Sequence, residues 1–247
     1  MADKPLRLGF LYPDYSAEDD YPRIAAMLRP PIEAIVVHTS IGEDAHRVDA
    51  LLDTGDAARL HEGAERLKPL HPAAAMWACT SGSFVFGLEG ARDQARRVQD
   101  VLGVPVSSTS LAFPEACRAL GLRRVAIAAT YPADIADLFR QFLADSGVEV
   151  VNVGALGIIT GVEVGHVGRT AVLDHATRND HPRAEAILLP DTALHTIEFL
   201  DELEAAAGKT VLTANQVTVW EALRLAGALM PQEGLGTLFR TPIPARA

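Results

Sequence analysis

Cys79 is the residue in this sequence best placed to act as a nucleophile or as an acid/base. It follows an apolar run and begins the segment Cys-Thr-Ser-Gly-Ser, in which small hydroxyl side chains and Gly82 favour a tight turn into a helix. Backbone N–H groups at such a turn stabilise a thiolate, so we predict a thiol pKa below its free value of about 8.5. A buried, inert cysteine is the alternative interpretation. Cys117 fits that alternative, because it lies inside the helical stretch 114–121.

Asp191 is the second candidate, because it directly follows the apolar segment Ile-Leu-Leu-Pro. A carboxylate buried there without a partner is costly. We predict that Asp191 faces Cys79 across a cleft, so that one face of a substrate meets sulfur and the other meets a carboxylate. The two groups would then titrate as a coupled unit that shares one proton near neutrality. The alternative is that Asp191 caps a helix over residues 192–203.

Hydroxyl side chains near these two residues form a candidate donor set. Thr80, Ser81, Tyr131 and Thr192 offer hydroxyl and amide donors that could stabilise a carboxylate as it becomes an enediolate. We expect a bound carboxylate against them, although Ser and Thr are common in turns of every kind. His195 lies four residues after Asp191 and either orients that carboxylate or is a solvated helix histidine.

Several other classes of protein are disfavoured by the sequence pattern. The eight histidines and two cysteines show no HExxH or CxxC spacing, and the glycine-rich segment 154–168 lacks both nucleotide-binding motifs. A net charge of −10, with no run of Lys or Arg longer than a pair, argues against nucleic acid and anionic membranes as partners. The N-terminal residues lack a leader-like apolar core, and no apolar run reaches 18 residues. We therefore expect a cytoplasmic protein with free thiols.

Apolar runs of strand length alternate along the chain with amphipathic segments of helical period. This alternation is typical of parallel sheets covered by helices, and the 49% hydrophobic content is ample for their cores. Strands are predicted within 6–13, 32–38, 73–81, 104–110, 123–132, 148–157, 184–192 and 209–216, and helices over 57–68, 88–102, 133–146 and 197–207.

The order of these elements repeats. Leu11-Tyr12-Pro13 recurs as Thr130-Tyr131-Pro132, residues 77–81 recur as 189–193, and residues 104–121 resemble 210–227, with offsets that shrink steadily. We infer two similar α/β halves, one of residues 1–110 plus 216–247 and the other of residues 111–215. Two such halves facing each other place their strand ends around one shared cleft. The repeat therefore predicts a functional site at the strand ends that carry Cys79 and Asp191.

Six segments carry a resemblance to a known family. They are the opening strand LGFLYP, ACTSGSF at 78–84, ALGLRRVAIA at 119–128 followed by Tyr131, LGIITGVE at 156–163, ILLPD at 187–191 and WEALRLAG at 220–227. In this order they resemble the aspartate/glutamate racemase superfamily, and within it the branch of maleate cis-trans isomerases and arylmalonate decarboxylases. The resemblance implies two flavodoxin-like domains related by a pseudo-twofold axis, an active site between them, and no metal or organic cofactor.

The resemblance also bears on individual residues. Racemases and maleate isomerases of the superfamily have a cysteine at the strand end of each half, whereas the decarboxylases keep only the second. Cys79 matches the first position, but Asp191 stands at the second. Thr80, Ser81, Tyr131 and the backbone at Thr192 match the decarboxylase donor set. In the loop after the first strand, Pro13 and Ser16 are candidate substrate contacts, and Ser16 stands where maleate isomerases have Asn.

Three functions follow from these residues. The leading hypothesis is isomerisation or proton transfer at a small carboxylate, with a dicarboxylate favoured, using Cys79 as nucleophile or acid/base and Asp191 as its partner. The second is decarboxylation of a malonate-like acid, in which Cys79 protonates the enediolate. The third is an inactive carboxylate-binding homologue. The sequence is compatible with a homo-oligomer.

Overall fold

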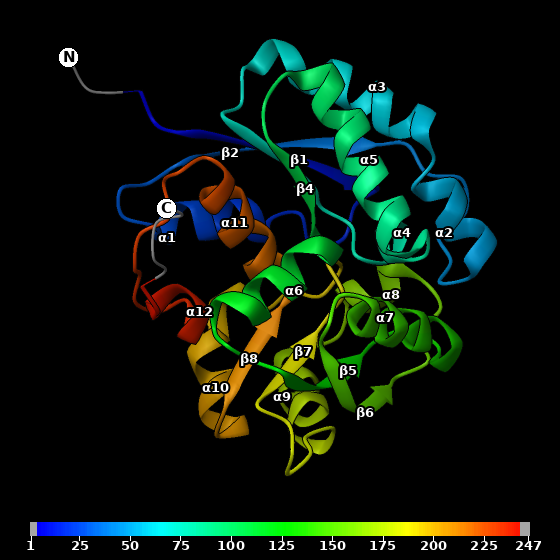
Figure 1. Ribbon diagram of the computed structural model, residues 1–247, viewed down its shortest axis with the longest axis vertical. Coiled ribbons are helices and arrows are strands. Elements are labelled where there is room, and N and C mark those ends of the chain that lie inside the picture. The colour runs from blue at the N-terminus through cyan, green and yellow to red at the C-terminus, as the bar shows by residue number, and fades with distance from the viewer. Residues whose placement is uncertain (1–3, 243–247) are drawn as a thin grey trace.

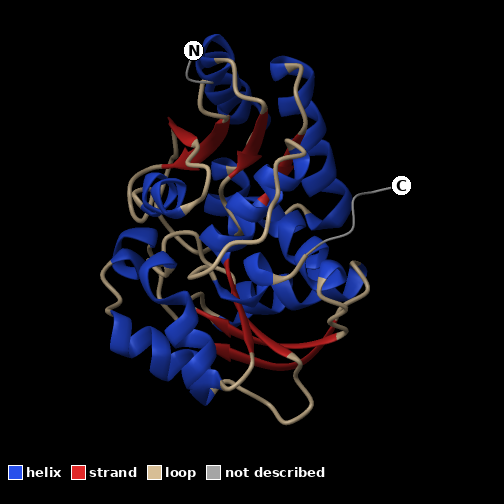
Figure 2. Cartoon of the chain, turned by 90° about the vertical axis from the view of Figure 1, so that its left-hand side faces the viewer, coloured by secondary structure: helices blue, strands red, loops and turns tan. Residues whose placement is uncertain are grey.

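Two parallel four-stranded sheets with the same strand order organise the chain (Figures 1 and 2). The computed structural model describes residues 4–242. The first sheet has the order β2-β1-β3-β4 and the second the order β6-β5-β7-β8, so each strand of one has a counterpart in the other. The strands are β1 (Arg7–Pro13), β2 (Glu33–Thr39), β3 (Ala74–Trp77), β4 (Val106–Ser108), β5 (Arg124–Ala129), β6 (Glu149–Ala155), β7 (Ala186–Leu189) and β8 (Thr210–Thr213).

Helices follow most of the strands and pack against the sheets. Before β5 they are α1 (Asp20–Met27), α2 (Val48–Thr54), α3 (Ala57–Leu67) with the 3₁₀ turn Lys68–Leu70, α4 (Ser81–Phe84), α5 (Gly87–Leu102) and α6 (Thr109–Ala119). After β5 they are α7 (Ala133–Asp145), α8 (Gly161–Gly165), α9 (Arg169–Arg178), the 3₁₀ turn Ile197–Phe199, α10 (Leu200–Ala207), α11 (Ala214–Leu225) and α12 (Gly236–Arg240).

Helices on both faces explain why the central strands are apolar throughout. Helices α3 and α5 pack together over the first sheet, and α1 and α11 also pack together and contact it (Figure 1). Every residue of β3 and of β7 is buried as a result. A strand covered on both faces has no solvated side, so its sequence shows a continuous apolar run instead of alternation.

Local turn chemistry sets several of the helix ends. The Asp56 side chain accepts from the Ala58 N–H at the start of α3, and Ser108 caps α6 in the same way. Thr213 and Gln216 form a capping box at the start of α11. Gly103 adopts the left-handed conformation that ends α5.

All eight predicted strands and the duplicated order are present. The four predicted helices are present too, although the segment 197–207 begins as a 3₁₀ turn. The helix proposed over residues 192–203 is wrong at its start, because residues 192–194 form a turn and residues 195–196 are irregular. Their N–H groups are used by side chains instead: Ala193 donates to Asp191 and Thr196 donates to Asp20.

The two halves are fastened to each other by α11 and by Asp20. Helix α11 follows β8 in sequence but also packs against β3 and β4, whereas α12 packs against β8. Asp20 is buried and accepts from the Thr196 N–H and from the Asn215 amide, and its burial raises its pKa. The division into residues 1–110 plus 216–247 and 111–215 stays a prediction, and its ends at 1–3 and 243–247 lie outside the described residues. Within residues 4–242, no helix is long and apolar enough to cross a membrane.

Candidate active site

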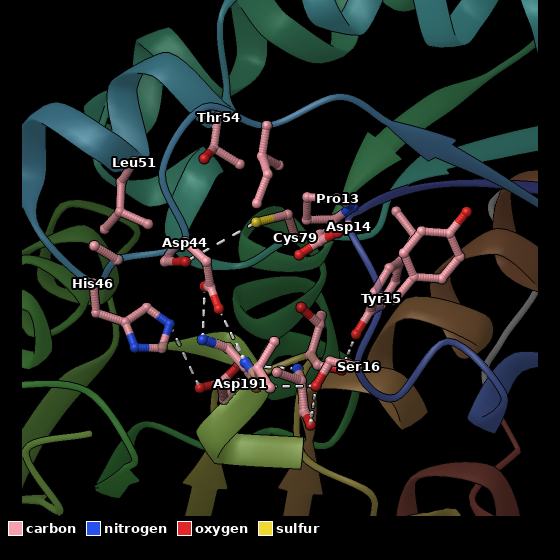
Figure 3. Close-up of a pocket in the computed structure, with 18 of the residues that line it drawn as sticks. Pro13, Asp14, Tyr15, Ser16, Asp44, His46, Leu51, Thr54, Cys79 and Asp191 are labelled. Carbon is pink, nitrogen blue, oxygen red and sulfur yellow. Dashed lines mark hydrogen bonds and ion pairs between the residues drawn. The ribbon is translucent and has the colours of Figure 1, made fainter. Parts of the chain in front are cut away.

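A small cavity of about 60 Å³ lies where the carboxyl ends of strands from both sheets meet (Figure 3). Six segments line it: residues 12–16 at the end of β1, 41–46 after β2, Leu51 and Thr54 of α2, the turn after β3, the start of α8, and 191–193 after β7. The cavity therefore occupies the position that the sequence repeat predicts.

Cys79 reaches this cavity from the turn between β3 and α4 and is only 5% exposed. The Gly82 N–H donates to its Sγ at 3.3 Å, and the Ser81 hydroxyl lies 4.0 Å from the sulfur. A Cβ on residue 82 would lie 3.1 Å from Sγ and 3.3 Å from the Trp77 ring. Glycine therefore allows the backbone to approach the sulfur this closely.

Burial raises the pKa of the Cys79 thiol to about 12, which makes the predicted lowering wrong. The Gly82 N–H and the Ser81 hydroxyl lower the pKa, but they do not offset the loss of water around the sulfur. Helix α4 has only four residues, so its end adds little. The charge of Asp191 adds to the increase, in the predicted direction. The thiol is therefore protonated at neutral pH.

Asp191 faces the same cavity from the end of β7 and is also 5% exposed. Its Oδ1 accepts from the Ala193 N–H at 2.9 Å, and its Oδ2 accepts from the Thr130 hydroxyl. Figure 3 shows Cys79 and Asp191 on two sides of the pocket. The structure thus brings the predicted pair together, and their chemical roles stay predictions.

The predicted donor residues differ in their access to the cavity. Ser81 and Thr192 line it, whereas Thr80 and Tyr131 are buried beside it. The Tyr131 hydroxyl donates to the Pro190 carbonyl at 2.6 Å, and burial raises its pKa well above the usual range. Within the described part of the chain, the Thr80 hydroxyl has no hydrogen-bond partner. Carboxylate binding by this set stays a prediction.

The first-strand loop contributes both of its predicted residues. Pro13 and Ser16 line the cavity, and the Ser16 hydroxyl lies 3.0 Å from the Gly161 carbonyl and 3.2 Å from the Ala193 carbonyl. Ser16 therefore connects the first half to two segments of the second. Substrate contact by either residue stays a prediction.

His195 does not orient Asp191, so that interpretation is wrong. Its Nε2 lies 2.8 Å from Oδ1 of Asp19, near the start of α1. The expected helical turn from Asp191 to His195 is absent, because the chain forms turns there. The imidazole is consequently directed toward Asp19.

Asp44 and His46, which sequence reasoning missed, also line the cavity, as does Tyr12 from a strand end that the repeat places at the cleft. The Tyr12 hydroxyl donates to the Thr192 carbonyl at 3.1 Å. Tyr12 is the counterpart of Tyr131 in the sequence repeat. Asp44 and His46 lie in the irregular segment 40–47, where no periodic pattern indicates which side chains turn inward.

The charge of the lining is strongly negative. Asp14, Glu43, Asp44 and Asp191 border the cavity, and none of the described lining residues is Lys or Arg. His46 is the only lining side chain in this set that can become a cation near neutral pH. Across residues 4–242, no three His, Cys, Asp or Glu side chains are grouped so that they could hold a metal ion.

Two duplicated parallel sheets that share one cavity at their strand ends define a two-lobed α/β protein of the racemase-like superfamily branch, as predicted. The chain belongs to the arylmalonate decarboxylase family, whose family model matches residues 54–239.

Relatives with known activities support this membership. The chain is 32% identical over 180 residues to arylmalonate decarboxylase of Bordetella bronchiseptica, covering 71% of this chain and 75% of the relative. It is 24% identical over 125 residues to maleate isomerase of Alcaligenes faecalis, covering 50% and 49% of the two chains. These relatives are a decarboxylase and an isomerase, which are the two classes of enzyme predicted.

Solved structures show the same fold. A cysteine variant of arylmalonate decarboxylase in the liganded form matches with a TM-score of 0.84 and 26% identity, over 96% of this chain and 99% of that one. The maleate isomerase Iso from Pseudomonas putida S16 matches with a TM-score of 0.87 and 20% identity, over 95% and 98%. The predicted fold class is therefore confirmed.

Proposed function

We propose that this protein is a cofactor-independent isomerase of the racemase type, which moves a proton at the carbon next to a carboxylate of a small acid. The observation that supports it most is the shared cavity of Cys79 and Asp191, which come from equivalent strand ends of the two halves. Two acid/base groups on opposite sides of one carbon are what inversion at that carbon requires.

The protonated thiol assigns a direction to the first step. Asp191 takes the proton from the substrate carbon, and the electron pair of that C–H bond moves into the carboxylate as an enediolate. The Cys79 thiol then gives its proton to the opposite face of the carbon. The resulting thiolate accepts the hydrogen bond of the Gly82 N–H, and the backbone and hydroxyls at Ser81 and Thr192 stabilise the enediolate.

Decarboxylation is the second candidate, and family membership favours it. Loss of CO₂ from a malonate-like acid leaves the same enediolate, which the protonated Cys79 thiol can quench. Asp191 then has no proton to accept. The two reactions therefore differ in their need for Asp191.

The charge of the lining bears on the substrate. A dianion such as a malonate or maleate would meet four carboxylates with no Lys or Arg among the described lining residues. In place of the dicarboxylate that the sequence favours, we propose a substrate with one free carboxylate and a neutral or cationic substituent. This preference supports isomerisation over decarboxylation, because decarboxylation of a malonate begins from the dianion.

NMR in D₂O with a panel of small acids tests the proposal directly. The panel contains amino acids, hydroxy acids, maleate and an arylmalonate. Solvent deuterium at the carbon next to a carboxylate, in an acid that keeps all its carboxylates, would establish proton transfer, and loss of a carboxylate would establish decarboxylation instead. Binding of these acids without either change would favour the inactive carboxylate-binding alternative.

Two substitutions separate the reactions once a substrate is found. Cys79→Ala should abolish turnover in both, because it removes the proton donor. Asp191→Asn should reduce isomerisation by about 10²–10⁴-fold, since it removes the second acid/base, and should affect decarboxylation much less. Cys117→Ala is the matched control, because this second thiol is buried in the core away from the cavity. Turnover by Cys79→Ala would contradict the cysteine-centred mechanism.

A further inference from the structure

His46 is held in one orientation by the second half of the protein. Its backbone N–H donates to the Ile159 carbonyl at 2.6 Å, and its Nδ1 lies 3.0 Å from the Ile158 carbonyl. A carbonyl oxygen can only accept, so Nδ1 must carry the hydrogen. The neutral ring therefore has its lone pair on Nε2.

Nε2 of His46 points at the carboxylate of Asp191. It lies 4.0 Å from Oδ2, and the two side chains are only 7% and 5% exposed. The edge-on Tyr131 ring, with centroids 4.8 Å apart and planes at 76°, limits rotation of the imidazole. The Thr130 hydroxyl fixes the same oxygen of Asp191 from another side. Figure 3 shows the imidazole and the carboxylate facing each other across the wall of the pocket.

The surroundings of His46 are acidic. The cavity lining is anionic and offers no Lys or Arg among the described residues, so an imidazolium would be the only cation facing the carboxylate. The titratable groups that line the cavity with it are Asp14, Glu43 and Asp44 from the first half, Cys79 after β3, and Asp191 after β7, while Tyr131 packs against the ring.

We propose that His46 is the proton-relay residue of this site and that His46 and Asp191 work as one acid/base pair in place of a second thiol. The inference rests on the proposed function, in which Asp191 takes the proton from the substrate carbon. That proton then passes from Oδ2 to the lone pair of Nε2, which leaves an ionised carboxylate beside an imidazolium. Transfer requires the 4.0 Å separation to shorten to about 2.6–3.2 Å, a tightening common when a substrate binds.

His46→Asn tests the relay with little change to the loop. The Asn amide can still donate to the Ile158 carbonyl, but it cannot take up a proton. We expect kcat to fall by about 10²–10⁴-fold, with KM changed only a few-fold, because the loss affects proton transfer and not binding. His38→Asn is the matched control, since His38 Nδ1 also lies near a backbone carbonyl, 2.6 Å from Asp14 O, and its side chain does not line the cavity. That variant should keep wild-type kcat.

A second measurement needs neither a substrate nor the His46 variant. The ring nitrogens of His46 are observed by ¹⁵N NMR at fixed pH in the wild type and in Asp191→Asn. Loss of the facing carboxylate should shift the Nε2 resonance of His46 more than the Nδ1 resonance, which the Ile158 carbonyl holds in both proteins. An Nε2 resonance that does not move overturns the pair, whatever the enzyme turns over. Full kcat in His46→Asn overturns the relay and leaves the proposed function standing.

Discussion

Cys79 lies in a turn where two influences on its thiol oppose each other. The nearby N–H and hydroxyl groups stabilise a thiolate, whereas the loss of solvent around the sulfur favours the thiol. Burial has the larger effect, and it raises the pKa to about 12. The resting residue is thus a proton donor, and a nucleophilic role would require a bound substrate or base to remove the proton first.

The reactivity of Cys79 toward iodoacetamide should therefore rise steeply with pH. Only the thiolate is alkylated, and below a pKa of about 12 its fraction increases roughly tenfold for each pH unit. Mass spectrometry of the Cys117→Ala variant, in which Cys79 is the one remaining cysteine, should show no plateau between pH 7 and pH 10. A bound substrate should slow the reaction at every pH.

The opposite result would have a clear meaning. An alkylation rate that levels off below pH 9 would show a lowered thiol pKa, as the residue types alone suggest. The reference measurement is the Cys79→Ala variant, in which Cys117 should react slowly, because burial raises its pKa to about 12 as well.

Cys79 and Asp191 were predictable from the sequence because each ends an apolar run. His46 was not, since its role depends on a contact between the irregular segment 40–47 and residues far along the chain. The residues in such a contact are far apart in the sequence, so no local sequence pattern indicates it. The same holds for His195, whose partner Asp19 lies in the other half.

At the level of elements, an apolar run or a one-sided helical pattern decides what the sequence reveals. The buried strands form apolar runs and the helices α3, α5 and α7 have clear helical periodicity, and all of these were predicted. Helix α11 has twelve residues but is buried almost all round, and it was not predicted. Helices α2, α4 and α8 have seven, four and five residues, which is too short for a period of 3.6 to show. Helix α8 is fixed instead by caps, among them the distant Asp44.

Asp44 should therefore matter for both stability and activity. Its carboxylate accepts from the N–H groups of Gly161 at 2.7 Å and Val162 at 3.1 Å, and it holds segment 40–47 against α8. Asp44→Ala should lower the free energy of unfolding by about 1 kcal/mol in urea titrations. It should also reduce kcat/KM by up to about 10²-fold, because segment 40–47 carries His46.

Asp56→Ala separates these two effects. Asp56 caps α3 through the Ala58 N–H at 2.8 Å and does not line the site cavity, so its loss should reduce stability by a similar amount with unchanged kcat/KM. Equal activity losses in the two variants would mean that Asp44 acts only through stability.

For the whole molecule, the repeat predicted the duplicated sheets and the position of the site. It did not predict how the halves are joined, because the joining contacts have no counterpart in the other half. The buried Asp20, for example, accepts hydrogen bonds from Thr196 and Asn215. The offset that pairs Tyr12 with Tyr131 in the repeat pairs Asp20 with Phe139, which is not an acid. Contacts between the halves arise once in the chain, so internal comparison cannot find them.

The charge of the whole molecule leads to the last prediction. The net charge is −10, and four carboxylates surround the cavity, so an anionic substrate approaches against a repulsive field. Raising the salt concentration from about 0.01 M to 0.15 M shortens the screening length from about 30 Å to about 8 Å. We expect kcat/KM to rise over this range, more for a dianion than for a monoanion and least for a zwitterionic amino acid. Steady-state rates at fixed pH measure this order.

The variant Asp14→Asn removes one of the four carboxylates and keeps a side chain that is tolerated at the positive φ of 54° there. It should raise kcat/KM at low salt and weaken the dependence of kcat/KM on salt. A kcat/KM that falls with salt would instead show that the site attracts anions through donors that outweigh its carboxylates.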